Sequence, residues 1–476
     1  MPSIQQAIIA WIGDMYFFAY IREVISLRLA RTWFIIHGLS LYWTYTCTRP
    51  FSNSTEATLF CIALYYWPRA LDTGHKTAWM PFAKALLAAF TCVLFRPTSL
   101  VMWSFLGSKL VIDTLRYQSL RVALKCLVLA MLIGVLVLGG GFLLDSLYFG
   151  EATWTIRNFF VVNVVCSLSA HYGENVWHWY FTVGLPSVLT LLAPFSMFNW
   201  WRSLRVLGQG PFHSLAVLCF WTISAYSFLA HKEARFLQPV VPIMHLFAVQ
   251  LFRPLSDSWK SCWRSIPKVL RYLLISQVPI TLYVTMFHAH GQIAVMQYIH
   301  SVASPRTSVG FLMPCHSTPW QSHMHARNLE VLDLDNKLVS GDEGRAWFIT
   351  CDPPLCHDPS TYWSQTDFFL EDPVKYLTER FPSKVDRSFP PMQVAHFRAP
   401  GPSNKTDVFA QHISSDQGWR HTWPTHLVMY SSLLDVGLPM TVGELLTRRG
   451  YREEKRFWNA LWHPEKERQG DVVVFG

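Results

Sequence analysis

Charge is what this sequence has least of. Charged side chains make up 15% of the 476 residues, against about 25% in an average protein. The shortage is concentrated in residues 1–290, which argues against an ordinary soluble fold there. The net charge of +9 comes without a Lys/Arg-rich arm or zinc-finger spacing, so it does not indicate a nucleic-acid partner. The chain also lacks GxSxG, HExxH, P-loop and Rossmann fingerprints in their proper context.

The ten cysteines do not form a disulfide framework. Six of them fall in or near the apolar region, namely Cys47, Cys61, Cys92, Cys126, Cys166 and Cys219. Cys351 and Cys356 either pair in an oxidising compartment or remain two thiols. Cys315, His316, His323 and His325 resemble a zinc set in composition, but no CxxC accompanies them. We therefore expect a folded loop there, no metal site and no cofactor.

A secretory signal peptide is also missing. Residues 1–21 have neither a basic start nor a small-residue cleavage site, and Asp14 interrupts their apolar run. They are typical of a membrane helix that begins abruptly.

What is present is a series of apolar runs, each near the roughly 20 residues that cross a bilayer as a helix. The ten candidates are residues 4–20, 32–47, 55–68, 78–95, 98–114, 126–145, 183–200, 212–230, 236–252 and 270–288. Several are short, so we expect some to be tilted, broken or re-entrant.

The basic residues orient these runs. Most short-loop Lys and Arg residues follow the first, third, fifth, seventh and ninth runs, and the positive-inside rule places those loops in the cytosol. The opposite face then carries segments 146–182 and 231–235 and the tail after residue 290. The sequons at Asn53 and Asn404 fall on this second face.

The predicted fold class is an all-α polytopic membrane protein with a smaller C-terminal domain. We expect a transmembrane bundle of about ten helices over residues 1–290. Within it, segment 146–182 is expected to be a non-cytosolic loop with short helices. Residues 291–476, rich in Pro, Asp, His and Ser, are expected to form an α+β domain on the same side.

The segment His231-Lys232-Glu233-Ala234-Arg235-Phe236 places four ionisable side chains between two apolar runs. A charge at mid-membrane costs about 2.5–3.5 kcal/mol on insertion scales. The cluster therefore lies at a membrane face or in a wet cavity. Lys232 and Arg235 either neutralise a phosphate or form a closed ion network with Glu233 that fixes a helix end. Arg96, before Pro97, is either a snorkelling side chain at a turn or a second phosphate ligand.

The segment 171–180 combines aromatic and polar side chains. It contains His171, Glu174, Trp177, His178 and Trp179. One interpretation is an interfacial aromatic belt. The other is a platform on which aromatic faces stack against a sugar, while His, Glu and Asn exchange hydrogen bonds with hydroxyl groups.

The motif 231–236, followed by Pro239 and Pro242, resembles the signature of the family 22 glycosyltransferases. Met313-Pro314-Cys315-His316-Ser317-Thr318-Pro319 is similar to the branch of that family that acts on the glycosylphosphatidylinositol (GPI) precursor. The resemblance covers residues 1 to about 330; residues 340–405 depart from the family pattern.

The resemblance implies a GT-C-type transmembrane bundle in the endoplasmic reticulum membrane with a lumenal C-terminal domain. It implies a hexosyltransferase that adds the third, α-1,2-linked mannose to the GPI precursor from dolichyl-phosphate mannose. Its partners would be this lipid-linked donor, the GPI glycolipid acceptor and membrane lipids. The substrate-binding residues carried over are Arg96, His171, Trp177, His178, Trp179, His231, Lys232 and Arg235.

The family's catalytic carboxylate lies in an acidic Asp-Glu motif of the first lumenal loop, which this sequence does not contain. We therefore expect a chain shortened by its first helix and that loop, with Glu174 and Glu233 as weak stand-ins for the base. The alternatives are a related enzyme acting on dolichol-linked oligosaccharide, one adding a fourth GPI mannose, and an inactive or non-enzymatic membrane protein such as a transporter.

Overall fold

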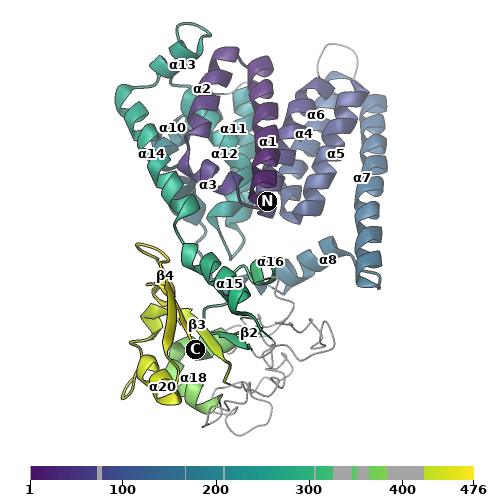
Figure 1. The fold of residues 1–476 in the computed structure, drawn as a ribbon. Coiled ribbons are helices and arrows are strands. Elements are labelled where there is room, and N and C mark those ends of the chain that lie inside the picture. Colours follow the sequence, from purple (N-terminus) through teal and green to yellow (C-terminus); the bar gives the residue numbers. More distant parts are fainter. Residues whose placement is uncertain are drawn as a thin grey trace. The chain divides into compact units, whose positions relative to one another are not determined.

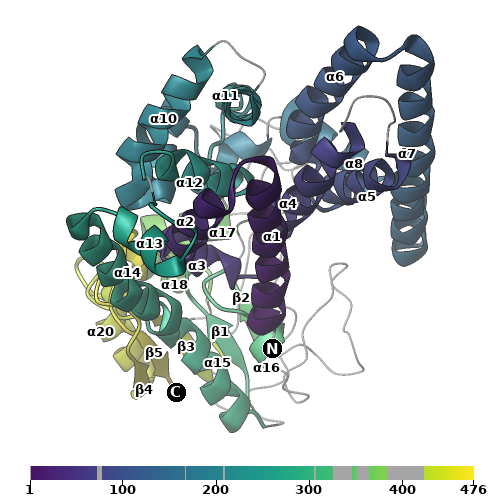
Figure 2. The same cartoon turned by 90° about the horizontal axis from the view of Figure 1, so that it is seen from above.

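The computed structural model divides into two compact units, Met1–Leu282 and Tyr283–Gly476 (Figures 1 and 2). The residues described are 2–71, 78–166, 168–206, 210–252, 254–304, 307–324, 346–349, 351, 364–381, 383 and 423–476.

The first unit is helical throughout its described residues. In chain order its elements are α1 (Pro2–Val24), α2 (Leu27–Gly38), α3 (Leu41–Cys47), α4 (Ser52–Leu71), α5 (Trp79–Phe95), η1 (Pro97–Ser99), α6 (Leu100–Tyr117), α7 (Leu120–Phe149), α8 (Thr155–Phe160), η2 (Val161–Val165), η3 (Leu168–Tyr172), η4 (Tyr180–Gly184), α9 (Leu185–Leu189), η5 (Thr190–Leu192), α10 (Ala193–Arg205), α11 (Pro211–Ser227), η6 (Ala234–Val240), α12 (Val241–Val249), α13 (Trp259–Ser265) and α14 (Lys268–Met286).

Three continuous helical stretches are long and apolar enough to cross a membrane: Leu120–Phe149, Tyr180–Arg205 and Lys268–Val302. Other expected crossings are broken. The run 32–47 stops at Gly38 and restarts at Leu41, with Ser40 as the residue before α3. The run 236–252 is a 3₁₀ helix up to Val240 and an α-helix after it. Pro239 and Pro242 each lack the N–H that an uninterrupted helix needs, which favours the change of helix type.

Helices α1 and α4 approach each other closely at Gly13. A Cβ added to Gly13 on α1 would lie 2.9 Å from the Thr58 Cα on α4. Thr58 also donates its hydroxyl to the Ile9 carbonyl at 3.3 Å. Small residues at such contacts allow membrane helices to approach closely.

Helix α7 stands at the edge of the unit beside α5 (Figures 1 and 2). Only 6% of its most apolar 18-residue segment is buried inside the protein. It meets α5 where Gly134 faces Phe90 and Gly141 faces Leu94. Two adjoining apolar pockets, of about 590 and 710 Å³, lie along this contact and share Phe90, Leu127 and Ala130.

The second unit is built on a five-stranded sheet of order β2-β1-β3-β5-β4. Its strands are β1 (Val309–Phe311), β2 (Ala346–Phe348), β3 (His426–Tyr430), β4 (Glu453–Phe457) and β5 (Val472–Phe475). Its helices are α15 (His290–Val302), α16 (Gln321–Met324), α17 (Gln365–Glu371), α18 (Pro373–Glu379), η8 (Ser431–Leu433), α20 (Val442–Arg449) and η9 (Lys466–Arg468). Strand β1 pairs in parallel with β2 and β3, while β5 pairs antiparallel with β3 and β4.

Strand β3 is buried on both faces of the sheet, whereas the edge strand β4 is exposed. Along β3, Leu427 and Met429 join a core with Trp347. Val428 and Tyr430 join a second core with Phe311. The two-residue period of a strand divides the side chains between the two faces in this way.

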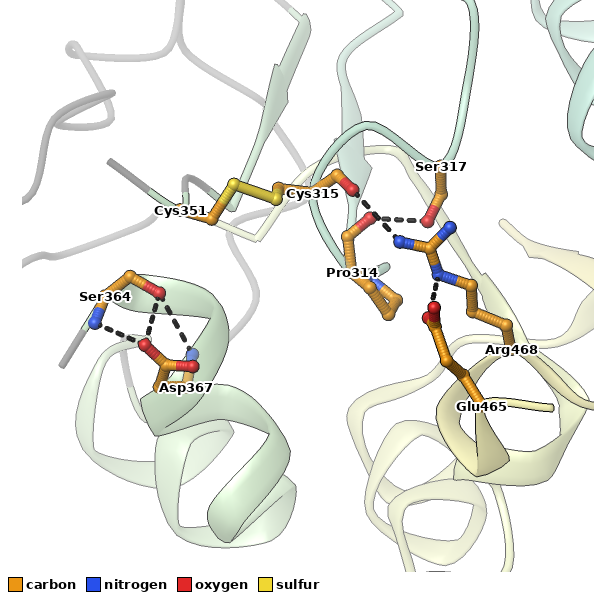
Figure 3. Close-up of a disulfide and its surroundings, with 8 residues drawn as sticks. All are labelled: Pro314, Cys315, Ser317, Cys351, Ser364, Asp367, Glu465 and Arg468. Atoms are coloured by element: carbon orange, nitrogen blue, oxygen red, sulfur yellow. Dashed lines mark hydrogen bonds and ion pairs between the residues drawn. A yellow bond between two sulfur atoms is a disulfide. The ribbon is translucent and has the colours of Figure 1, made fainter. Parts of the chain in front are cut away.

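Cysteine pairing differs from the expectation. Cys351 is bonded to Cys315, not to Cys356 (Figure 3); Cys356 lies outside the described residues. This bond also consumes two of the three side chains of a possible metal cluster, Cys315, His316 and Cys351, since a disulfide sulfur is not a thiolate ligand. Cys47, Cys61, Cys92, Cys126 and Cys219 are free thiols, as expected, whereas Cys166 is disulfide-bonded.

The sequon residue Asn53 lies in a packed part of the fold. Its residue is only 1% exposed, and Arg96 donates to its Oδ1 at 3.2 Å. A side chain packed in this way leaves no room for a glycan in the folded protein. Asn404 lies outside the described residues.

Replacing Gly13 with alanine is expected to lower the melting temperature of the detergent-solubilised protein, because the added methyl group forces α1 away from α4. Overpacking of this kind costs about 1–3 kcal/mol. The control is Gly140→Ala on α7, whose Cβ would meet open space. Tryptophan fluorescence during heating measures both variants, and equal melting temperatures would contradict the close helix contact.

Candidate functional site

Two loops that are far apart in the sequence are held together by Asn175 and Lys232. The Asn175 backbone N–H donates to the Ala230 carbonyl at 3.0 Å, and its side-chain amide donates to the Lys232 carbonyl at 3.1 Å. The Lys232 amine donates back to the Asn175 carbonyl at 2.7 Å. We call these three bonds the Asn175–Lys232 clamp. It places segment 171–180 directly against segment 231–235.

The geometry gives Lys232 a structural position. Its residue is 4% exposed, and its amine also donates to the carbonyls of Leu229 and Ala230 at 2.5 and 3.5 Å. An ammonium group has three N–H donors, and here backbone carbonyls receive them. The expectation of a phosphate ligand at Lys232 therefore does not fit this arrangement.

Glu233 holds its two neighbours in place. Its Oε1 accepts from Arg235 Nη2 at 2.7 Å and faces His231 Nε2 at 2.9 Å, while its Oε2 pairs with Arg235 Nε. The other ring nitrogen of His231 faces the Gly173 carbonyl at 2.9 Å. Burial opposes ionisation of Glu233, but the hydrogen bonds from Arg235 and His231 outweigh it and lower the pKa of Glu233. A carboxylate held ionised in this way is a poor base.

Arg235 is the exposed cation of this group. Its side chain is 47% exposed, although two of its nitrogens, Nε and Nη2, pair with the Glu233 carboxylate. A guanidinium that is oriented but open to solvent can still bind an oxyanion through its remaining donors.

Arg96 lies beside the same motif. Its guanidinium lies 5.2 Å from the centre of the Phe236 ring and pairs with buried Glu56 at 3.0 Å. It also donates to Ser52 Oγ at 3.0 Å. Arg96 therefore ties the start of α4 to the 231–236 motif, with Nη1 as its hydrogen-bond donor.

Polar atoms at this junction lack partners among the described residues. Glu56 Oε1, Asn53 Nδ2 and Gln238 Oε1 are buried without a hydrogen bond, although Gln238 donates its amide N–H to Ser54 Oγ at 3.0 Å. Buried polar groups are normally satisfied, so these atoms mark a place where water or a ligand hydroxyl fits.

The aromatic loop is open. Trp177 is 71% exposed and its nearest ring is that of His178, 5.4 Å away. Trp179 is partly buried against Tyr180. Glu174 is exposed, and its carboxylate lies near enough to Lys232 to favour the charged form of that amine. The side chain of His171 lies outside that part.

Of the predicted site residues, Arg96, His231, Lys232, Glu233 and Arg235 come together. Trp177, His178 and Trp179 lie on the adjoining loop, which the clamp attaches to them. Tyr42, which we did not predict, joins from α3 by donating its hydroxyl to the Ala234 carbonyl at 3.3 Å.

Sequence analysis also missed a buried polar relay. Asp14 on α1 faces His37 Nε2 at 3.2 Å and accepts from Trp43 Nε1 at 3.2 Å. The other nitrogen of His37 meets His245 Nδ1 at 2.8 Å. If His37 donates to Asp14, His245 must donate to His37, which links α1, α2, α3 and α12 in one chain of hydrogen bonds. The one signal in the sequence was Asp14 inside an apolar run.

The loops expected to be cytosolic also meet one another. Arg28 donates to Asp257 at 2.8 Å, and Arg31 lies 5.3 Å from the Trp259 ring centre. Figure 1 shows α13, which carries Trp259, and α8, which follows Phe149, at opposite ends of the first unit. The loops after the first and ninth apolar runs therefore lie together in this unit.

Known proteins are similar to this chain over all of its length. The model of the Alg9-like mannosyltransferase family matches residues 1–325. GPI mannosyltransferase 3 of Yarrowia lipolytica is 31% identical over all of this chain and 81% of its own length. The corresponding figures are 29% and 77% for GPI mannosyltransferase 3 of Debaryomyces hansenii, again over the whole chain. GPI alpha-1,2-mannosyltransferase 3 of Mus musculus is 30% identical over the whole chain and 74% of its length.

Among solved structures, ArnT from Cupriavidus metallidurans bound to undecaprenyl phosphate aligns with a TM-score of 0.56. The alignment covers all of this chain and 83% of ArnT at 12% identity, so the likeness is one of fold. The fold class is therefore the GT-C-type membrane bundle that we predicted.

Changing Lys232 to methionine keeps the side-chain length and removes its donors. We expect segment 173–178 to exchange its amide hydrogens faster, because the carbonyls left unpaired cost about 1–3 kcal/mol each. Hydrogen exchange followed by mass spectrometry measures this. Lys125→Met, at an exposed position on α7, is the control. Unchanged exchange in segment 173–178 would show that the clamp does not hold the loop.

Proposed function

This chain belongs to the Alg9-like mannosyltransferase family, and from that premise we propose that it adds the third, α-1,2-linked mannose to the GPI precursor, with dolichyl-phosphate mannose as donor. Its similarity to GPI mannosyltransferase 3 from several organisms supports the GPI acceptor. The name of the mouse relative supports the α-1,2 linkage.

The observation that carries the proposal is the arrangement around Arg235. Departure of a polyprenyl phosphate develops a second negative charge on the phosphate, which positioned cations stabilise. Arg235 is exposed and is aimed by Glu233. The Arg96 guanidinium lies 5.2 Å from the centre of the Phe236 ring. We assign the donor phosphate to Arg235 and give Arg96 and Lys232 the task of fixing the surrounding segments.

The apolar pockets beside α7 suit the tail of such a donor. They are lined almost wholly by apolar side chains, among them Phe82, Leu86, Met131, Val135 and Phe142. ArnT, which shares the fold, is described as bound to undecaprenyl phosphate. An isoprenoid chain placed along α5 and α7 would bury apolar surface in the same manner.

The proposed reaction is a displacement at the anomeric carbon of mannose. An acceptor hydroxyl attacks, a carboxylate takes its proton, and the phosphate leaves. Glu233 is committed to Arg235 and His231. Glu174 is the carboxylate of segment 171–180 that remains accessible, and we assign it as the stand-in base. His178, Trp177 and Trp179 would contact the sugars. We expect no metal or cofactor to take part.

We place the protein in the endoplasmic reticulum membrane, with the second unit in the lumen. The bond between Cys315 and Cys351 supports this side, since disulfides persist in oxidising compartments. The opposite loops carry the positive charge, as cytosolic loops do.

Two other functions remain as alternatives. A related enzyme would act on dolichol-linked oligosaccharide or add a fourth GPI mannose. The 313–319 motif and the names of the relatives favour the third mannose. A transporter would show an internal repeat, which the sequence does not have.

Arg235→Ala is expected to abolish mannose transfer while the protein remains inserted in the membrane. Microsomes are prepared from cells that lack the endogenous activity and accumulate the two-mannose GPI precursor. Adding the unvaried chain should produce a three-mannose glycolipid that an α-1,2-mannosidase shortens. Arg121→Ala, at an exposed position on α7, should retain transfer.

Normal transfer by Arg235→Ala would remove the phosphate role of this residue. Extension of dolichol-linked oligosaccharide in place of the GPI precursor would favour the related enzyme. Failure of the unvaried chain to convert the precursor would contradict the proposed activity of this chain.

The proposed topology predicts which asparagines receive glycans in microsomes. Asn404 should be modified, whereas a sequon introduced near Arg264 and the buried Asn53 should not. Endoglycosidase-sensitive mobility on gels measures the result. A glycan near Arg264 would place the 253–271 loop in the lumen and reverse the proposed orientation.

A further inference from the structure

The second unit contains a small cavity that the proposed mannose transfer does not use. It has a volume of about 150 Å³, well below the roughly 300–1,000 Å³ of pockets that hold drug-sized ligands. Its lining is the loop Pro314–Thr318 together with Phe311, Met313, Trp320 and Phe348. A space of this size fits one small ring.

One wall of the cavity is aromatic. The Trp320 ring meets Phe311 edge-on at 5.2 Å and Phe348 at 4.9 Å. These two contacts fix the position of the indole, and part of the Trp320 residue remains exposed. An indole fixed in this way offers a flat apolar face against which the C–H side of a ring can pack.

The facing wall is a loop fixed from several directions (Figure 3). The disulfide joins Cys315 to Cys351, and Ser317 donates its hydroxyl to the Pro314 carbonyl. Arg468 donates to the Cys315 carbonyl at 3.5 Å and pairs with Glu465 at 2.7 Å. This wall is therefore rigid before any ligand arrives.

Both walls contain a residue in a strained backbone conformation. His316 has φ +59° and Trp320 has φ +45°, values that side chains other than glycine seldom adopt. Such strain persists where the surrounding structure enforces it and is frequent at ligand sites. Here it turns the exposed His316 side chain and the Trp320 ring toward one cavity.

The chemistry of the lining selects among ligand classes. A metal is disfavoured because the cysteine sulfurs are bonded to each other. An anion is disfavoured because Arg468 is already paired with Glu465. What remains is a partly exposed indole that lines the same cavity as the residues His316 and Thr318, which combines stacking with hydrogen bonds. Such a pair of walls suits the C–H face and the hydroxyl edge of a sugar.

We propose that this cavity is a carbohydrate-binding site that takes one hexose ring of a mannose-containing glycan. The inference rests on the proposed function, since it names a second place where the enzyme holds its glycan substrate. His316 and Thr318 exchange hydrogen bonds with the sugar hydroxyls, and Trp320 stacks on the ring.

The test is a titration of the full chain in detergent micelles with methyl α-mannoside, followed by saturation-transfer NMR. The Trp177→Ala chain serves as background, so that sugar contacts of segment 171–180 are reduced. We expect saturable binding that His316→Gly weakens on the order of tenfold, the effect of losing one hydrogen bond.

His316→Gly also separates binding from folding. Glycine adopts φ +59° without strain, so this variant should melt at or above the temperature of the parent chain while binding the sugar less well. Trp320→Phe, which keeps an apolar ring, should weaken binding too. Trp462→Ala is the control, because Trp462 is 69% exposed in the same unit and lies outside the cavity lining.

Equal affinity in His316→Gly and the parent chain would overturn the inference, as would the absence of saturable binding to the parent chain. Neither result changes the conclusion of the transfer experiment with Arg235→Ala, because that experiment measures mannose transfer and not sugar binding to the cavity. Transfer that survives Arg235→Ala would instead count against the proposed function and leave the sugar titration unaffected.

Discussion

The site depends on one buried ammonium group. Lys232 donates to carbonyls of two loops that are otherwise separated by more than two helices in the sequence. Burying an ammonium group is unfavourable unless its donors are satisfied, and backbone carbonyls satisfy it here. Separating the loops would break the hydrogen bonds that Lys232 donates to these carbonyls. The aromatic segment 171–180 and the ionic segment 231–235 therefore behave as one surface. The orientation of Arg235 by Glu233, and the contact of Phe236 with Arg96, are built on that surface.

Sequence patterns recovered the residues of this surface better than their roles. Arg96, His231, Glu233 and Arg235 were recognisable because ionisable groups between apolar runs are expensive and therefore rarely incidental. Lys232 looked the same in the sequence, and only its burial shows that its donors point to the backbone. The relay through Asp14, His37 and His245 escaped because its members lie on three separate helices. Which helix faces meet is a property of packing that no single segment encodes.

Part of the fold could likewise be predicted from the sequence and part could not. Apolar runs located most helices of the first unit, since lipid imposes length and composition on them. Their interruptions depended on Pro239, Pro242 and Ser40, whose effects on neighbouring turns vary with context. In the second unit, the pairing of Cys315 with Cys351 depends on strands β1 and β2 lying side by side. From the sequence, Cys351 either paired with Cys356 or remained a thiol, because sequence distance does not report contacts across a sheet.

The exposed position of α7 has a consequence for how any occupant reaches the pockets beside it. Most of this helix faces outward, and the pockets between it and α5 are apolar. Their entrance is therefore from within the bilayer, not from water. An occupant arrives by diffusion in two dimensions and must displace the hydrocarbon chains of ordinary lipids. Its occupancy then follows its mole fraction among membrane lipids, so the richness of the membrane in long-chain isoprenoids, more than any aqueous concentration, would set how often the pockets are filled.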